Sequence, residues 1–203
     1  MKETDIRVTK EDVIRAASDL ADQQGLNGVS LKSVAEQLGL RAPSLYNHVL
    51  SLDDLLRDMA HRGMREMNRR MTEAAVGVSG IEAIQAASRA YFGFMIEHPG
   101  VYETIQWAVW HGSDETAEIF SSYQALLARL ISSCGIDRHC LEEITDLLAG
   151  LLHGYCTLQL GAALDDPKRA ETALHGCLDT VLTGICEKYS PREKPHKQQL
   201  GGS

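Results

Sequence analysis

Two short helix-forming segments joined by one glycine turn constrain this chain more than any other feature. Residues 31–38 read LKSVAEQL, with apolar residues at helical spacing, and Gly39 then ends the segment. The next stretch, LRAPSLYNHV, begins its helix near Pro43, because a proline in the first helical turn removes an N–H that would be unpaired anyway. The pattern predicts a helix-turn-helix motif at about residues 30–49.

The remainder of the chain is also typical of helices. Only 5 prolines occur in 203 residues, and 44% of the residues are hydrophobic, enough to bury a core. Thr9 precedes an amphipathic helix at residues 10–24, and Ser51 precedes a long helix at about 52–75. Five more helical patterns follow before residue 190. We therefore predict an all-α fold of about nine helices.

The order of these elements predicts two domains and a tail. Residues 7–70 form an N-terminal three-helix domain with the helix-turn-helix motif, joined by the long helix to a C-terminal helical domain at 78–189. The sequence GVSG, at residues 77–80, is the clearest boundary between them. Residues 190–203 are polar and rich in Pro and Gly, which predicts a disordered tail.

Charge is distributed unevenly along the chain. The formal net charge is −8, yet residues 1–70 hold eleven Lys/Arg and eleven Asp/Glu, while the rest holds nine and seventeen. Any contact with a polyanion should therefore come from the first third of the chain, where arginine is dense.

Several classes of protein are disfavoured. No apolar stretch follows Met1, and the longest apolar segment contains Asp146 and His153, so we expect neither a signal peptide nor a membrane span and predict a cytoplasmic protein without a membrane partner. Five cysteines occur without a CxxC pair, which disfavours a disulfide framework and a metal site. We predict no metal and no other cofactor.

The first third of the chain resembles a known family. The stretch SLKSVAEQLGLRAPSLYNHVLSLDDLL, within residues 7–70, is similar to the DNA-binding domain of TetR-family (tetracycline-repressor-like) transcriptional regulators. The segment AVWHGSDE resembles a Trp-His-Gly subgroup of that family. The resemblance implies a homodimeric repressor that binds a palindromic double-stranded DNA operator and is released by a small-molecule effector.

The resemblance also implies roles for residues of the motif. Arg41 would bind guanine or clamp a phosphate, Ser44 and Asn47 would read bases, and Tyr46 would anchor the DNA backbone. Leu52 departs from the family, which often has a lysine there, so one phosphate contact is absent or is supplied by Arg57 or the Leu52 N–H. The candidate DNA contacts are Ser30, Lys32, Arg41, Ala42, Pro43, Ser44, Tyr46, Asn47 and His48.

Aromatic residues are concentrated between residues 91 and 123, either as ordinary core or as the wall of an effector pocket. The pocket would accept a small apolar or aromatic effector, or a cationic one if Glu97, Glu103 and Glu118 faced it rather than solvent. The candidate pocket residues are Phe94, Met95, Gln106, Trp107, Trp110, His111, Phe120, Tyr123, His153 and Gln159.

The last two helical patterns carry wide apolar stripes with small residues one turn apart. In a monomer such a helix could be central, whereas the resemblance implies that both helices pair with those of a second copy in a four-helix bundle. The candidate dimer residues are Leu147, Gly150, Leu151, Gly154, Leu158, Leu174, Leu178, Val181 and Ile185.

Two other classes of function compete with a regulator. An enzyme could pair His111 with Asp114 or His153 with Cys156, but no nucleophile elbow, phosphate loop or paired metal ligands accompany them, so we predict no catalytic residue. An all-α protein-interaction adaptor would have no need for Lys32 and Arg41 at groove-facing positions.

Overall fold

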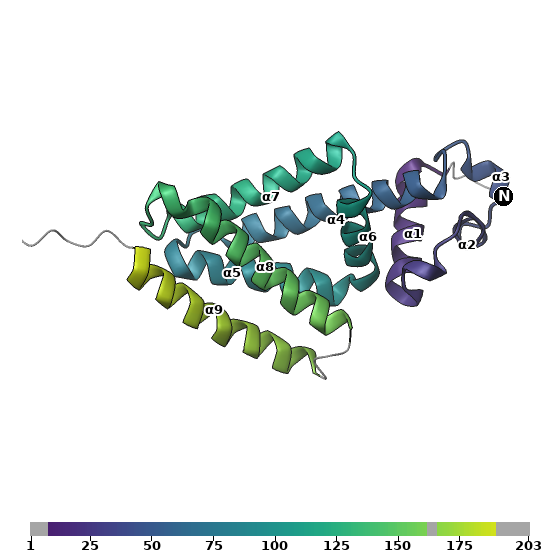
Figure 1. The fold of residues 1–203 in the computed structure, drawn as a ribbon. Coiled ribbons are helices and arrows are strands. Elements are labelled where there is room, and N and C mark those ends of the chain that lie inside the picture. Colours follow the sequence, from purple (N-terminus) through teal and green to yellow (C-terminus); the bar gives the residue numbers. More distant parts are fainter. Residues whose placement is uncertain (1–7, 162–165, 190–203) are drawn as a thin grey trace, which may run out of the picture.

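The computed structural model describes residues 8–161 and 166–189, and within these ranges every regular element is a helix (Figure 1). The prediction of an all-α fold with about nine helices is confirmed. The segment predicted as a tail, 190–203, lies outside the described residues. The α-helices are α1 (Lys10–Gln24), α2 (Leu31–Gln37), α3 (Ala42–Leu45), α4 (Leu52–Ala74), α5 (Gly80–Glu97), α6 (Pro99–Trp110), α7 (Asp114–Ser132), α8 (Leu141–Leu160) and α9 (Pro167–Tyr189), with short 3-10 turns η1 (Leu26–Gly28) and η2 (Arg138–Cys140).

The long helix α4 joins the two ends of the molecule. Helices α1 to α3 lie at one end, α5 to α9 form a bundle at the other, and α4 runs through both (Figure 1). Its start is fixed locally, because Ser51 Oγ accepts a hydrogen bond from the Asp54 N–H and the Asp54 carboxylate accepts one from the Leu50 N–H, each at 3.0 Å. The helix then continues for 23 residues without a proline.

Two hydrophobic cores divide the chain, and the division falls inside α4. Leu55 and Met59 belong to the N-terminal core with α1 to α3, whereas Ala60, Met64 and the rest of α4 pack into the C-terminal core. The GVSG sequence at residues 77–80 instead marks the turn between α4 and α5, both of which contribute to the C-terminal core. One rigid helix therefore belongs to both cores.

The short helices of the N-terminal domain begin at side-chain caps. Thr9 and Asp12 form a capping box at the start of α1, as Ser30 and Ser33 do at α2. Gly39 supplies the left-handed conformation (φ 66°) that reverses the chain before α3. Helix α3 has only 4 residues, and tighter turns extend it through bonds such as that from the His48 N–H to the Leu45 carbonyl, at 2.8 Å.

Helix α6 is wedged between α1 and α4, and two glycines permit the close approach. A Cβ placed on Gly100 would lie 2.0 Å from the carbonyl carbon and oxygen of Ala21 in α1. A Cβ on Gly63 of α4 would lie 2.5 Å from a methyl group of Val101 in α6. Any side chain at Gly100 would collide with backbone, which cannot move aside as a flexible side chain can. This packing joins the N-terminal domain to the C-terminal bundle.

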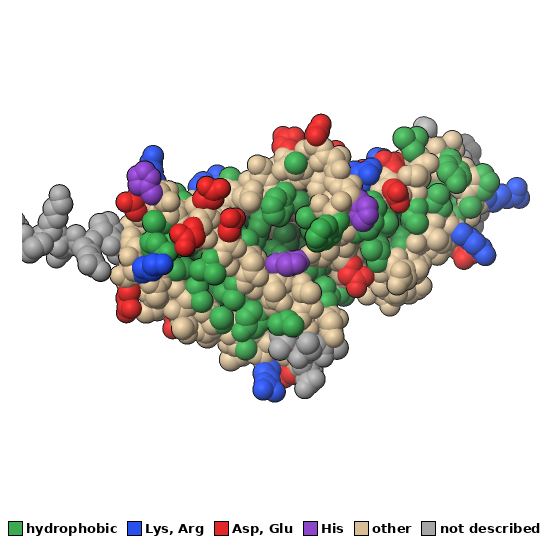
Figure 2. Space-filling model, viewed as in Figure 1, with side chains coloured by type: hydrophobic (Ala, Val, Ile, Leu, Met, Phe, Trp, Pro, Cys, Tyr) green, Lys and Arg blue, Asp and Glu red, His purple; other side chains and the backbone are tan. Residues whose placement is uncertain are grey.

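Helices α8 and α9 lie together along one side of the bundle, beside α5 (Figure 1). Figure 2 shows hydrophobic side chains gathered on this face and a hollow, lined by hydrophobic groups, close to a histidine. None of the helices in the described part of the chain has the length and apolar character needed to cross a membrane.

Candidate functional site

The end of the molecule formed by α2 and α3 presents the residues expected to contact DNA. Arg41 and Asn47 are exposed, and 59% of the Tyr46 side chain is accessible, while Leu45 (0%) and Val49 (2%) are buried beneath them. Inward apolar residues thus fix the segment to the core and leave its polar residues outside. Of the remaining candidates, Ser30, Lys32 and Pro43 are exposed, and Ala42, Ser44 and His48 are partly buried.

Most of the arginines in the first third of the chain are engaged within the molecule. Arg62 pairs with Glu11 at 2.8 Å, and Arg69 holds Glu66 so closely that the pKa of that carboxyl falls to about 2. In contrast, Lys32 has only a distant acidic neighbour on its own helix, Glu36, at 3.8 Å. Arg41 forms no ion pair with any residue in the described ranges. Lys32 and Arg41, which border the helix-turn-helix surface, are therefore available to bind phosphate.

Ser30 and Leu52 have structural roles within the N-terminal domain, and Arg57 is partly buried. The Ser30 Oγ accepts from the Ser33 N–H at 3.0 Å and lies 3.0 Å from the Ser33 Oγ, so its first role is to cap α2. Leu52, where the family often has a lysine, is partly buried against the N-terminal core. Arg57 is only partly exposed, and its Nε is buried without an acceptor among the described residues.

A carboxylate of the N-terminal domain caps the start of α6. Asp22 of α1 accepts from the N–H groups of Gly100 and Val101 at 2.9 and 3.0 Å, and its other oxygen lies 2.9 Å from His98 Nδ1. A negative charge at a helix N-terminus is stabilised by the unpaired N–H groups and the helix dipole. The contact therefore joins α1 and α6 by a charge-assisted bond as well as by packing.

Helix α6 makes a second polar contact with the N-terminal domain. Glu103 accepts from the Leu26 N–H at 3.1 Å, in the turn that follows α1. One turn further along, Trp107 packs against both hydrophobic cores and stacks on the His111 ring, with centroids 4.8 Å apart. The face of α6 directed at the DNA-binding end is thus occupied by junction residues.

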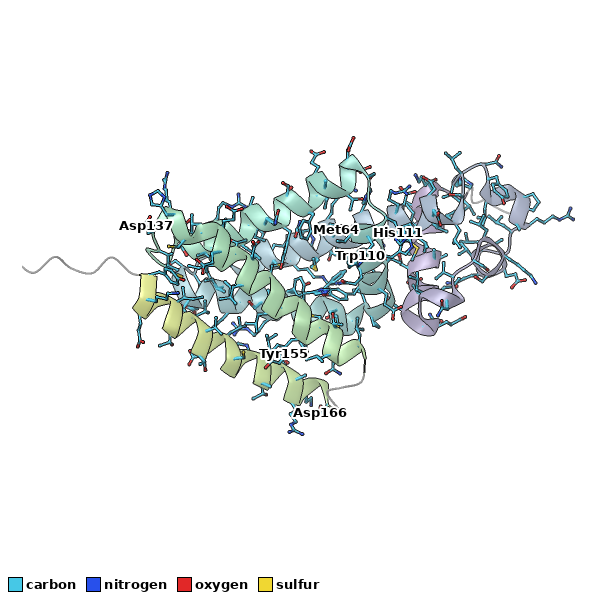
Figure 3. All side chains as sticks on the ribbon, viewed as in Figure 1. Met64, Trp110, His111, Asp137, Tyr155 and Asp166 are labelled. Carbon is cyan, nitrogen blue, oxygen red and sulfur yellow. The ribbon has the colours of Figure 1, made fainter. Side chains whose placement is uncertain are left out.

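A cavity of about 300 Å³ lies in the C-terminal bundle, among α4, α5, α6, α7 and α8. Met64 of α4 and Trp110 of α6 lie next to each other in this region (Figure 3). Its mouth is apolar, since Val109, Trp110 and Phe120 remain partly or largely exposed there. The lining residues are Met64, Met67, Asn68, Tyr91, Ile105, Gln106, Val109, Trp110, Phe120, Tyr123, Ala149, Gly150 and His153.

The structure brings half of the predicted pocket residues to this cavity. Gln106, Trp110, Phe120, Tyr123 and His153 line it, whereas the other five predicted residues do not.

Each of those five residues lies elsewhere for a packing reason. Met95 is buried in the C-terminal core, and Phe94 faces the domain junction, where the Arg70 guanidinium lies 5.4 Å from its ring. Trp107 and His111 stack on each other as described, and Gln159 lies farther along α8. Successive residues of a helix point in different directions, so proximity in sequence did not place these side chains in one pocket.

Helix α4 contributes lining residues that the sequence analysis missed. Met64, Met67 and Asn68 recur at helical spacing on one face of α4, a pattern that is typical of a core face and does not by itself indicate a pocket wall. Ile105, Val109 and Ala149 were also missed, and Tyr91 belongs to the predicted aromatic cluster although it is not one of the ten candidate pocket residues. Gly150, predicted for a dimer interface, lines the cavity.

Buried hydroxyl groups connect one wall of the cavity. The Tyr91 and Tyr102 hydroxyls lie 2.8 Å apart, and Tyr102 Oη lies 3.3 Å from His153 Nδ1. Burial raises the pKa of both tyrosines, and it raises the pKa of the nearby Cys156 thiol to about 12, so these groups are neutral at ordinary pH. The wall offers hydrogen bonds without charge.

A second, larger hollow lies at the junction of the two cores. It has a volume of about 700 Å³, lies between α1 and α4, and carries charged residues such as Arg62 and Glu66 on its walls. Many of these charges are already paired with each other, as Arg62 is with Glu11. The smaller apolar cavity is therefore the better candidate for a small-molecule site.

The predicted dimer residues divide into two groups. Leu147 and Leu158 are 50% and 49% exposed, and Gly154, Leu151 and Val181 are partly exposed, so all five can reach a partner. The expectation for the other members on α9 must be corrected. Leu174, Leu178 and Ile185 are at most 5% exposed because they pack into the core of their own chain.

A helix-turn-helix surface on one domain and a cavity in an all-α second domain define the class of one-chain DNA-binding regulators. The family model of the tetracyclin repressor-like C-terminal domain matches residues 84–181 of this chain. The HTH-type transcriptional regulator YobS of Bacillus subtilis (strain 168) is 30% identical over 185 residues, 89% of this chain and 94% of that protein. The chain therefore belongs to the TetR family of transcriptional regulators, and it is not an enzyme.

Other similar proteins agree with this assignment. The HTH-type transcriptional regulator Rv0681 of Mycobacterium tuberculosis (strain ATCC 25618 / H37Rv) is 27% identical over 161 residues, 79% of this chain and 74% of that protein. A single-residue variant of TetR from Acinetobacter baumannii AYE, solved in complex with minocycline, superimposes with a TM-score of 0.67 at 17% identity, covering 93% of this chain and 98% of that chain. The similarity to the Acinetobacter baumannii structure shows a shared fold.

Proposed function

We propose that this regulator is a homodimeric repressor that binds a palindromic operator and leaves it when a small molecule enters the C-terminal cavity. One observation carries the proposal: a single helix, α6, lines the cavity with its C-terminal half and is bonded to the DNA-binding domain through its N-terminal half. Binding in the cavity can therefore change the position of the helix-turn-helix surface.

The DNA-binding role is assigned to the exposed side chains of α2, α3 and the turn between them. Lys32 and Arg41 would bind phosphates or guanine, and Ser44, Asn47 and Tyr46 would meet base edges and the sugar–phosphate backbone. The exposure of Arg41 and its lack of an acidic partner among the described residues support this role. The overall acidity of the chain does not oppose it, since the excess negative charge lies beyond residue 70.

Dimer formation is assigned to the outer face of α8 and α9. Exposed leucines at positions 147 and 158 and the partly exposed Val181 supply apolar surface, while Gly154 and Gly184 have nothing within 4 Å of an added Cβ and permit close approach. A two-fold dimer would place two recognition helices at successive turns of DNA, roughly 34–36 Å apart. Sedimentation of the purified chain tests this assignment, since Leu147→Glu with Leu158→Glu should give a monomer.

The coupling is assigned to α6 acting together with α4. Ile105, Gln106 and Val109 of α6 border the cavity, and Gly100 and Val101 of the same helix donate to Asp22 of α1. An effector that moves α6 would shift α1 and the motif packed against it. The effector must bind the released state more tightly than the DNA-bound state, because only a difference in affinity can shift the equilibrium.

The experiment is a DNA-binding titration with a palindrome taken from the DNA upstream of the protein's own gene. Arg41→Ala should weaken binding roughly 5- to 100-fold at physiological salt, because a bidentate contact contributes about 1–3 kcal/mol. Arg129→Ala is the matched control, since it removes the same charge from an exposed position on α7. Equal affinity of wild type and Arg41→Ala would refute the assigned role.

A further inference from the structure

Most of the cavity wall is apolar. None of its lining residues is a lysine, arginine, aspartate or glutamate within the described part of the chain. The glutamates that favoured a cationic effector lie elsewhere: Glu97 pairs with Arg70 at 2.6 Å, Glu103 accepts from the Leu26 N–H, and Glu118 is exposed on α7 without lining the cavity. A charged ligand would therefore lose hydration without gaining an ion pair with any of these four residue types.

The walls are suited to a flat aromatic group. The ring centroids of Tyr91 and Tyr123 lie 5.9 Å apart, and those of Phe120 and Tyr123 lie 5.8 Å apart, so the rings form a tilted cluster at one side of the cavity. The thioethers of Met64 and Met67 line another side and are buried. Aromatic rings and methionine sulfur both interact favourably with an inserted ring.

A few polar groups interrupt the apolar lining. The amides of Asn68 and Gln106 and the imidazole of His153 reach the cavity. Asn68 Oδ1 is buried without a hydrogen-bond donor among the described residues, and a buried amide oxygen left unpaired costs about 1–3 kcal/mol. The amide can turn about its Cβ–Cγ bond and present either its oxygen or its nitrogen to a ligand.

We propose that the cavity binds an uncharged aromatic molecule of about two fused rings that carries one hydroxyl or carbonyl group, hydrogen-bonded to the Asn68 amide. The volume of about 300 Å³ lies at the small end of ligand pockets and sets this size. The inference deepens the proposed function and depends on it for the regulatory consequence, while the chemistry of binding depends on the cavity alone.

Four naphthalenes of similar size test the ligand class against the full-length protein. 1-Naphthol is neutral and polar, 1-methylnaphthalene is neutral and apolar, 1-naphthoate is anionic, and 1-naphthylmethylammonium is cationic. Equilibrium dialysis should rank 1-naphthol tightest. The methyl compound should bind roughly 3- to 10-fold more weakly, as one hydrogen bond contributes about 0.5–1.5 kcal/mol, and both ions should bind more weakly still.

Substitutions at Asn68 connect this ranking to the structure. Asn68→Leu keeps the size of the side chain and should lower the affinity for 1-naphthol to that for 1-methylnaphthalene. Asn68→Asp introduces a carboxylate and should raise the affinity for 1-naphthylmethylammonium above that of the wild type. Asn27→Leu makes the same chemical change on an exposed residue of the N-terminal domain and should leave all four affinities unchanged. Thermal melting checks that each variant is folded.

The outcomes separate the ligand class from the proposed function. The inference is overturned if either ion binds more tightly than 1-naphthol, if Asn68→Leu binds 1-naphthol as the wild type does, or if none of the four naphthalenes binds. Operator binding is measured in parallel on the same samples. A protein that ranks the naphthalenes as expected but never binds its operator refutes the proposed function alone, and the converse result refutes only the ligand class.

Discussion

The two ends of this molecule bury their apolar residues in different ways. The N-terminal core closes tightly around Val13, Leu45 and Leu55, each 0% exposed, while the C-terminal bundle encloses a cavity of about 300 Å³. Buried polar atoms without partners among the described residues occur on both sides of this division, at Arg57 near the N-terminal core and at Asn68 beside the cavity. The difference between the two ends is therefore one of packing: one end is closed, and the other leaves an internal space.

Size sharpens this contrast. The N-terminal core rests on the short helices α1 to α3 and the first turns of α4, so each buried residue is a large share of its stability. The C-terminal core draws on six helices and can lose contacts without losing its arrangement. The following changes probe this difference in order of expected effect.

Removal of one buried leucine from each core should have the largest effect. Leu45→Ala should cost about 2–5 kcal/mol of unfolding free energy and abolish operator binding, because Leu45 is the one buried residue of α3. Leu148→Ala, at a residue 1% exposed in the other core, should cost a similar amount but keep operator binding below its melting temperature. Thermal melting and DNA titration measure both quantities. Retained DNA binding in folded Leu45→Ala would contradict the contrast.

A side chain at Gly100 should break the connection between the two cores. Gly100→Val places atoms against the Ala21 backbone and should cost about 1–3 kcal/mol, with the two domains melting separately in calorimetry. Gly93→Ala is the control, since an added Cβ in α5 meets nothing within 4 Å and should be neutral or stabilise by about 1 kcal/mol. A single cooperative transition in Gly100→Val would show that α6 does not join the cores.

Asp22→Asn should reduce the ligand-induced release of the operator more than it reduces the free energy of unfolding. The change removes the charge that caps α6 and should cost about 1 kcal/mol, with operator affinity nearly unchanged and ligand-induced release reduced several-fold. Asp19→Asn, at an exposed residue of the same helix, provides the matched control. A full response to ligand in Asp22→Asn would remove this contact from the proposed route.

The smallest effect should come from replacing His61, a buried residue of α4, and it should appear in how stability depends on pH. Its Nε2 lies 2.8 Å from Thr116 Oγ1, and burial lowers its pKa below 6.5 although Glu115, 3.5 Å from Nδ1, opposes the shift. As the pH falls below 6.5, the imidazole of His61 is protonated more readily in the unfolded chain than in the folded one. The free energy of unfolding therefore decreases at acidic pH.

The corresponding measurement is melting temperature at pH 7.5 and 5.5. His61→Gln keeps a hydrogen bond to Thr116 and should reduce the acid-induced drop by roughly a degree or two. His139→Gln, at an exposed position in η2, should leave the drop unchanged. An identical drop in wild type and His61→Gln would show that the buried imidazole does not contribute.

Sequence reasoning succeeded where the structure is determined locally. The caps at Thr9, Ser30 and Ser51 and the turn at Gly39 lie within a few residues of the helices they bound, so spacing alone located α1, α2 and α4. The start of α3 near Pro43 followed from equally local rules. The resemblance then supplied the family, which the similar proteins confirmed.

Sequence reasoning was less successful where distant segments meet. The cavity is formed by five helices, and only their packing decides whether Trp107 or Trp110, three residues apart, turns towards it. The cap on α6 is supplied by Asp22, some 78 positions earlier in the chain, which no local pattern records. Leu174 and Leu178 were assigned to a partner because a wide apolar stripe does not distinguish a core from an interface.

The division of labour along α6 has a consequence for how such a protein can diversify. Its first turns carry Gly100 and Val101, which donate hydrogen bonds to Asp22 of α1, and its last turns carry Gln106 and Trp110, which line the proposed effector cavity. Mutations in the second set can alter what is recognised while the first set keeps the same output. Under the proposed function, natural or laboratory selection could thus change the effector while the operator and the genes under its control stay the same.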